Sequence, residues 1–139
     1  MKKIPISVLV LIYTKNKDIL ILKKNNGKDM WQSVTGSIND GESVDDAAKR
    51  EVYEETGLNA DNIINCNKQY IFEIYEMWRY KYDDNVTHNT EHVFLLELDE
   101  RKDIVIDKEE HVSYEWTSRV KAAEKVFSHT NRQAIFDLI

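Results

Sequence analysis

Three glutamates in the segment "REVYEETG", residues 50–57, have the types and the spacing that metal chemistry needs. Glu51, Glu54 and Glu55 would lie within about one turn of a helix, where like charges cost about 0.2–0.5 kcal/mol per pair. A divalent cation relieves that repulsion, and oxygen ligands select hard ions such as Mg²⁺, Mn²⁺ or Ca²⁺. Bound magnesium binds phosphate oxygens and activates water. The alternative for an isolated triplet is a solvated acidic helix that pairs with lysines elsewhere.

The flanking residues predict that this segment is a helix over residues 44–56. Ser43 is a good N-cap with Asp46 three residues on, and Gly57 suits the position after the last turn. At about 100° per residue, Glu51 and Glu55 fall beside the apolar stripe of the helix, and Glu54 lies on one flank. The stripe consists of Val44, Ala48 and Val52. The carboxylates are therefore expected to border a buried face.

The rest of the chain predicts strands that place this helix against a sheet. Two apolar runs around the polar turn "TKNKD" indicate a β-hairpin. Aromatic and apolar residues of one parity indicate a long strand up to residue 82, paired with the run "EHVFLLEL". Strands are expected at residues 6–13, 18–24, 32–35, 70–82, 91–98 and 111–116, and one or two C-terminal helices break near 128–130. This order predicts an α/β helix–sheet–helix sandwich in one domain, residues 1–139.

Composition narrows the partners of such a domain. The 139 residues carry a net charge of −6, which argues against a nucleic-acid partner bound to a basic face. No run is long enough to cross a membrane, and the basic start with an apolar run lacks a cleavage site, so a cytoplasmic location is expected. The single cysteine, Cys66, is interpreted as a plain thiol. His88 and His92 would lie about 13 Å apart on a strand, which disfavours a zinc site.

The spacing around the glutamates resembles a known signature. Gly36, five residues, Glu42, seven residues and then "REVYEETGL" match the Nudix box at each of its defined positions. The resemblance implies the family's α/β/α sandwich with a mixed β-sheet. It also implies Mg²⁺-dependent hydrolysis, with Mn²⁺ as a substitute, of a nucleoside diphosphate linked to another group. By this match Glu51, Glu54 and Glu55 would bind metal, Arg50 would orient a glutamate, and Gly36 would let the backbone approach phosphate.

Outside the box, the chain is similar to one branch of the family. "WQSVTGS" replaces the Pro-Gly-Gly turn of many members, and "FEIY", "NTEHVFLLEL", "EEHVSYEW" and "NRQAI" fit the branch that acts on dihydroneopterin triphosphate or dATP. The resemblance implies that Glu110 is a further metal ligand or the general base, with Glu109 as the neighbour that could be confused with it. It implies substrate contacts from Lys3, Lys24, Thr35, Gly36, Phe72, Glu73, Ile74, Tyr75 and Ser128.

The predicted function is release of pyrophosphate and a monophosphate from a pterin or purine triphosphate. Another Nudix substrate, such as a modified nucleotide, ADP-ribose or a dinucleoside polyphosphate, would keep the chemistry and change the products. A non-catalytic nucleotide-binding module is disfavoured because Glu51, Glu54 and Glu55 are all present. A calcium-binding or partner-binding acidic surface is a further alternative. The sequence leaves monomer and homodimer open.

Overall fold

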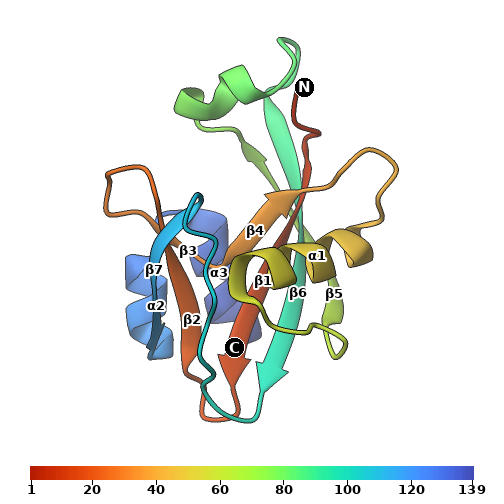
Figure 1. Ribbon diagram of the computed structural model, residues 1–139. Coiled ribbons are helices and arrows are strands. Elements are labelled where there is room, and N and C mark those ends of the chain that lie inside the picture. The colour runs from red at the N-terminus through yellow and green to blue at the C-terminus, as the bar shows by residue number, and fades with distance from the viewer.

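The computed structural model describes residues 1–139, and its centre is a mixed sheet of seven strands between helices (Figure 1). The strands are β1 (Ile6–Thr14), β2 (Ile19–Lys24), β3 (Trp31–Gln32), β4 (Val34–Ser37), β5 (Ile64–Glu73), β6 (His88–Leu98) and β7 (His111–Thr117). The helices are α1 (Val44–Thr56), the 3₁₀ helix η1 (Glu76–Lys81), α2 (Arg119–Lys125) and α3 (His129–Leu138). The expected α/β/α sandwich is confirmed. No helix is long and apolar enough to span a membrane.

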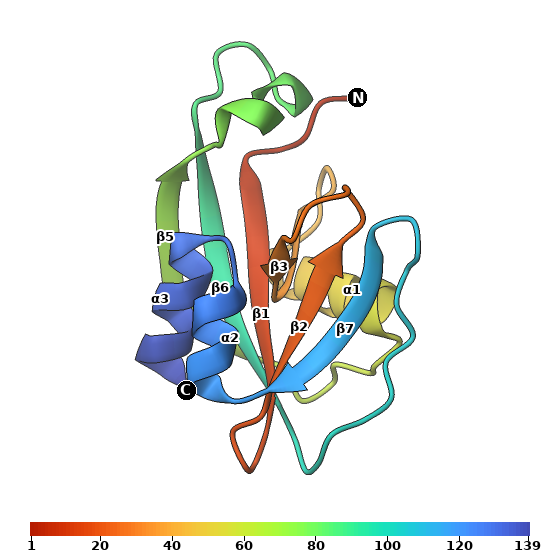
Figure 2. The same ribbon diagram turned by 90° about the vertical axis from the view of Figure 1, so that its left-hand side faces the viewer.

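The sheet divides into two wings, and this division creates the space for a site. One edge of β1 runs parallel to β6 over its full length. The other edge pairs with β4 over the first half of β1, from Ser7 to Val10, and meets β2 only at Tyr13 and Ile19. Beyond that point β2 turns away and pairs with β3 and β7. Figure 2 shows β1 and β2 leaving a common point and separating along their length.

Alternation along β1 gives each helical layer its own core, because successive side chains point to opposite faces of a strand. One set of buried residues packs with α1: Val8, Val10 and Ile12. The other set packs with α2 and α3: Leu9, Leu11 and Tyr13. Figure 2 shows α1 on one side of the strands and α2 and α3 on the other. A strand that is apolar on both faces therefore forms the centre of the fold.

Helix α1 has the bounds that its sequence predicts. The Ser43 hydroxyl accepts a hydrogen bond from the Asp46 backbone N–H at 3.1 Å, and Gly57 adopts a left-handed conformation at φ 75°. Glu51 and Glu55 are 8% and 1% exposed, so the expectation that these carboxylates border the buried face is confirmed. The first hairpin, between β1 and β2, is confirmed as well.

The long aromatic strand expected over residues 70–82 is wrong in its second half. β5 ends at Glu73 and pairs with β6 as an antiparallel hairpin, but η1 follows in place of further strand. The rings of Tyr75 and Trp78 both turn toward Phe127, with centroid distances of 5.9 and 5.6 Å. Packing against a residue some fifty positions away therefore overrides the local alternation.

Candidate active site

The buried carboxyl group of Glu55 is the most unusual feature of α1. Both of its oxygens are buried and neither has a hydrogen-bond partner. Burial raises the pKa of Glu55 well above its ordinary value, and the neighbouring Glu51 and Glu110 raise it further. Two orphaned oxygens on a buried carboxyl group destabilise a fold unless something binds them. This arrangement fits a divalent cation, which would satisfy the oxygens and cancel the repulsion.

Residues at the start of β7 complete the cluster. Glu110 and His111 bring ligand atoms that, with those of Glu55, all lie within 4.8 Å of one another. Burial, together with Glu51 and Asp107, raises the pKa of Glu110. Burial and the charge of Lys24 lower the pKa of His111 to about 4, so this imidazole is neutral at pH 7 and adds no positive charge to the cluster. The group formed by Glu55, Glu110 and His111 therefore contains no positively charged side chain at pH 7.

Arg50 holds the neighbouring glutamates in position, as its predicted role requires. Its guanidinium group donates to both oxygens of Glu42 at 2.9 Å and to Glu51 Oε1 at 2.8 Å. It also donates to the Ser37 carbonyl at 3.1 Å. Glu42 accepts a further hydrogen bond from the Asn39 backbone N–H at 2.9 Å, so it ties the loop before α1 to the helix. Glu51 is thus oriented by an arginine that is itself fixed at two other points.

Gly36 makes room for the side chain of Glu51. The resemblance implied that it lets the backbone approach phosphate. A Cβ atom added at Gly36 would overlap the carboxyl group of Glu51. The glycine of β4 therefore leaves the space that the Glu51 side chain occupies, and a larger residue would displace a candidate metal ligand.

Lys3, Lys24 and Lys81 lie close enough together for their charges to repel one another. Burial lowers the pKa of Lys3, and Lys81 lowers it further, while Glu110, Glu51 and Glu55 act in the opposite direction. Burial also lowers the pKa of Lys24, followed by the effects of Lys81 and Lys3. A polyphosphate relieves this mutual repulsion of ammonium groups. Lysines beside orphaned carboxylates suit a substrate that carries phosphates and a metal ion together.

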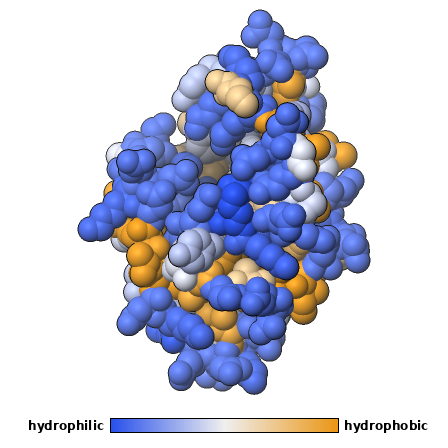
Figure 3. Space-filling view, turned by 45° about the vertical axis from the view of Figure 1, so that its right-hand side comes forward, coloured by the Kyte–Doolittle hydropathy of each residue, from blue (hydrophilic) through white to orange (hydrophobic).

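A cavity of about 960 Å³ joins these groups to the opening between the two wings of the sheet. Most of the predicted substrate residues line it: Lys3, Lys24, Thr35, Gly36, Phe72, Ile74, Tyr75 and Ser128. Glu51, Glu54 and Glu110 line it as well. Glu73 does not, and its exposed carboxylate pairs with Arg79 at 3.4 Å. The face shown in Figure 3 is mostly hydrophilic.

Several residues of the site escaped the sequence analysis. Lys81 belongs to η1, which was expected to be a strand. His111 follows Glu110 directly, and only its burial against Glu55, at 3.7 Å between Nε2 and Oε1, marks it. Ser7, Asn89, Glu91 and Asn131 are buried polar residues of the cavity wall. A polar residue inside an apolar strand, such as Asn89 or Glu91 in β6, is the signal that could have found them.

Comparison with known proteins agrees with this geometry. The NUDIX domain profile matches residues 3–138. The chain belongs to the Nudix hydrolase family. It is 41% identical over 138 residues to the dihydroneopterin triphosphate diphosphatase of Escherichia coli K12, covering 96% of this chain and 91% of that protein. It is 41% identical over 134 residues to the enzyme of the same name from Haemophilus influenzae, covering 93% and 84% of the two chains.

Similarity to solved structures supports the assignment of the chain to this family. The structure of the E. coli dihydroneopterin triphosphate pyrophosphohydrolase aligns with a TM-score of 0.94 at 39% identity, over 100% of this chain and 97% of that one. The Caenorhabditis elegans Ap4A hydrolase aligns with a TM-score of 0.73 at 18% identity, covering 94% and 92%, which is a likeness of fold alone. Nudix hydrolases generally use divalent metal ions, in agreement with the carboxylate cluster around Glu55.

Proposed function

We propose that this Nudix hydrolase cleaves dihydroneopterin triphosphate to the monophosphate and pyrophosphate, with Mg²⁺ as the natural metal and Mn²⁺ as a substitute. The observation that carries the chemistry is the pair of orphaned, buried Glu55 oxygens beside Glu110, within reach of three lysines. The substrate class rests on the 41% identity to the E. coli and H. influenzae diphosphatases of that name.

The lysines and glutamates of the site have separate places in this reaction. Lys3, Lys24 and Lys81 bind the phosphate oxygens and hold the chain of phosphates along the carboxylates. Glu51 and Glu55 would hold the metal, with Glu54 at the exposed edge, and Glu110 would be left to act on water. When bound, the metal supplies positive charge that stabilises the transition state and acidifies water.

Glu110 is the best-placed general base on this chain. It is more exposed than Glu55, and burial and the neighbouring Glu51 raise its pKa, which makes it a stronger base than an ordinary glutamate. The water oxygen forms a new P–O bond to one of the two phosphorus atoms that share the bridging oxygen between the α and β phosphates. The bond from that phosphorus to the bridging oxygen breaks, and the proton from water passes to Glu110. Arg50 contributes by keeping Glu51 in one orientation. The products are the pterin monophosphate and pyrophosphate.

A variant that removes the central carboxylate and keeps its shape tests the metal role. Glu55→Gln is expected to fold and to lose at least about 100-fold in kcat. Mg²⁺ should raise the Tm of the wild type and leave that of the variant unchanged, because ligand binding stabilises only a protein that binds it. The matched control is Glu97→Gln, an exposed glutamate of β6, which should behave as wild type. Full turnover by a folded Glu55→Gln protein would contradict the assignment.

A further inference from the structure

A second group of buried polar residues lies in the cavity away from the metal-binding carboxylates. Asn89 and Glu91 are two residues apart on β6 and so share one face, and Ser7 of β1 lies opposite Glu91 in the parallel register. The three residues are 3%, 5% and 7% exposed, and all line the cavity. Asn89 Nδ2 donates to Ser7 Oγ at 2.7 Å, which fixes the orientation of the amide.

Two acceptor atoms of this group have no partner. Neither Glu91 Oε1 nor Asn89 Oδ1 accepts a hydrogen bond from the protein. Glu91 takes part in no salt bridge, although burial raises its pKa only to about 7, so the carboxyl group ionises near neutral pH. Buried acceptors are normally satisfied. A cavity wall that carries an unpaired carboxylate oxygen and an unpaired amide oxygen favours a ligand that donates hydrogen bonds.

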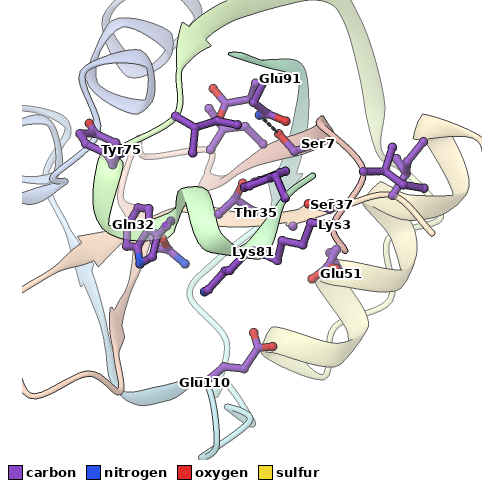
Figure 4. Close-up of a pocket in the computed structure, with 18 of the residues that line it drawn as sticks. Lys3, Ser7, Gln32, Thr35, Ser37, Glu51, Tyr75, Lys81, Glu91 and Glu110 are labelled. Carbon is purple, nitrogen blue, oxygen red and sulfur yellow. Dashed lines mark hydrogen bonds between the residues drawn. The ribbon is translucent and has the colours of Figure 1, made fainter. Parts of the chain in front are cut away.

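Aromatic rings line the same cavity and offer surfaces suited to a flat ligand. Tyr75, Trp78 and Phe127 line the same cavity and contact one another, with centroid distances of 5.5 to 5.9 Å. Figure 4 shows Glu91 and Ser7 at one end of the site and Glu51 and Glu110 at the other, with Lys3 and Lys81 between them. A substrate with an aromatic ring at one end and phosphates at the other matches this order.

We propose that Glu91, with Asn89, binds the ring of the substrate by accepting hydrogen bonds from adjacent N–H groups of a 2-amino-4-oxo pyrimidine edge. This inference rests on the proposed function and adds the residues that select the ring. In such an edge, the exocyclic amino group and the neighbouring ring N–H form two adjacent donors, and Glu91 Oε1 and Asn89 Oδ1 are the two free acceptors for them. Pterin and guanine carry this edge. Adenine places an acceptor nitrogen beside its amino group, so its lone pair would face the carboxylate.

Replacing the carboxylate by an amide tests this selection. In Glu91→Gln one acceptor becomes a donor, which no longer suits the pterin edge and suits adenine, since a glutamine amide pairs with adenine in two hydrogen bonds. We expect kcat/KM for dihydroneopterin triphosphate to fall at least about 10-fold and that for dATP to hold or rise. The ratio between the two substrates should therefore move by at least about tenfold. Glu97→Gln, on the same face of β6, should leave both values unchanged.

A phosphate-free probe separates this inference from the proposed reaction. Neopterin and adenosine are titrated into the wild type and into Glu91→Gln without metal, at a pH about one unit above the Glu91 pKa. We expect neopterin to bind the wild type at least about tenfold more tightly than the variant, and adenosine not to lose affinity. That result supports the subsite even if neither triphosphate is hydrolysed. An unchanged substrate ratio in an active, folded variant, or no neopterin binding by the wild type at millimolar concentration, overturns it.

Discussion

Glu91→Gln should stabilise the protein, and by an amount that grows with pH. The pKa of Glu91 is about 7 in the folded protein, against 4.5 for a free glutamate, because burial disfavours the charged form and the Thr130 hydroxyl offsets it only in part. At a pH between these two pKa values, Glu91 keeps its proton in the folded protein and has lost it in the unfolded chain. The contribution of Glu91 to stability is therefore highest at acid pH and is lost as the pH rises through 7.

The size of the effect follows from the two pKa values. Each pKa unit corresponds to about 1.4 kcal/mol, so ionised Glu91 reduces the free energy of unfolding by about 3 kcal/mol at about pH 8. At about pH 5 the reduction is only about 1 kcal/mol. A glutamine does not titrate, so the stability gained by Glu91→Gln should increase by about 2.5 kcal/mol between those pH values. For a chain of 139 residues this corresponds to about 8 °C in Tm.

The assay is urea unfolding of the wild type and the variant at both pH values, without metal or substrate. The difference between the proteins at one pH cancels the titration of all other groups, and any fixed effect of the new amide cancels between the two pH values. Glu97→Gln provides the matched control, since this exposed glutamate of the same strand should give a small difference that does not grow with pH. A Glu91→Gln difference that stays constant within about 0.5 kcal/mol would refute a buried carboxyl group with a raised pKa and no ion pair.

Three further substitutions test other contacts of the site. Gly36→Ala should lower kcat at least about tenfold in steady-state assays with little change in fold, because the new methyl group displaces the Glu51 carboxylate; wild-type kcat would disprove that packing. Arg50→Lys should lower the free energy of unfolding by about 1–3 kcal/mol in urea titrations and reduce kcat, since the single nitrogen of lysine cannot reproduce the guanidinium fork that binds Glu42, Glu51 and the Ser37 carbonyl; equal stability would count against the network. Glu110→Ala should abolish most turnover, while its circular dichroism spectrum shows that the variant is folded. If only Glu109→Ala loses turnover, the base is Glu109 and not Glu110.

The sequence was sufficient for features that local chemistry determines. Helix α1 could be placed from Ser43 and Gly57, because a cap is a contact within four residues. The apolar run of β1 identified a strand of the first hairpin. The order of helices and strands predicted the sandwich. Arg50 could be assigned as an orienting residue because Glu42, Glu51 and Glu54 lie within one box of the sequence.

Features that depend on distant contacts were out of reach. η1 forms where alternation predicted a strand, because Tyr75 and Trp78 pack on Phe127. The hydrogen bond from Asn89 to Ser7 joins residues 82 positions apart, through the parallel pairing of β1 with β6. The residues next to Asn89 in the sequence do not indicate that β6 pairs with β1. The sequence predicted a substrate contact from Glu73, but this side chain lies outside the cavity and pairs with Arg79. The match of the segment "FEIY" did not show which of its side chains face the cavity.

The most direct test of the proposed function is a product assay with dihydroneopterin triphosphate and, separately, dATP, with and without Mg²⁺, that resolves pyrophosphate from orthophosphate. We expect pyrophosphate and the pterin monophosphate, formed only when the metal is present and at least about tenfold faster than the products from dATP. Faster release from dATP would contradict the proposed substrate and leave a Nudix pyrophosphohydrolase of another specificity. No metal-dependent release of pyrophosphate from either compound would contradict the account of the active site itself.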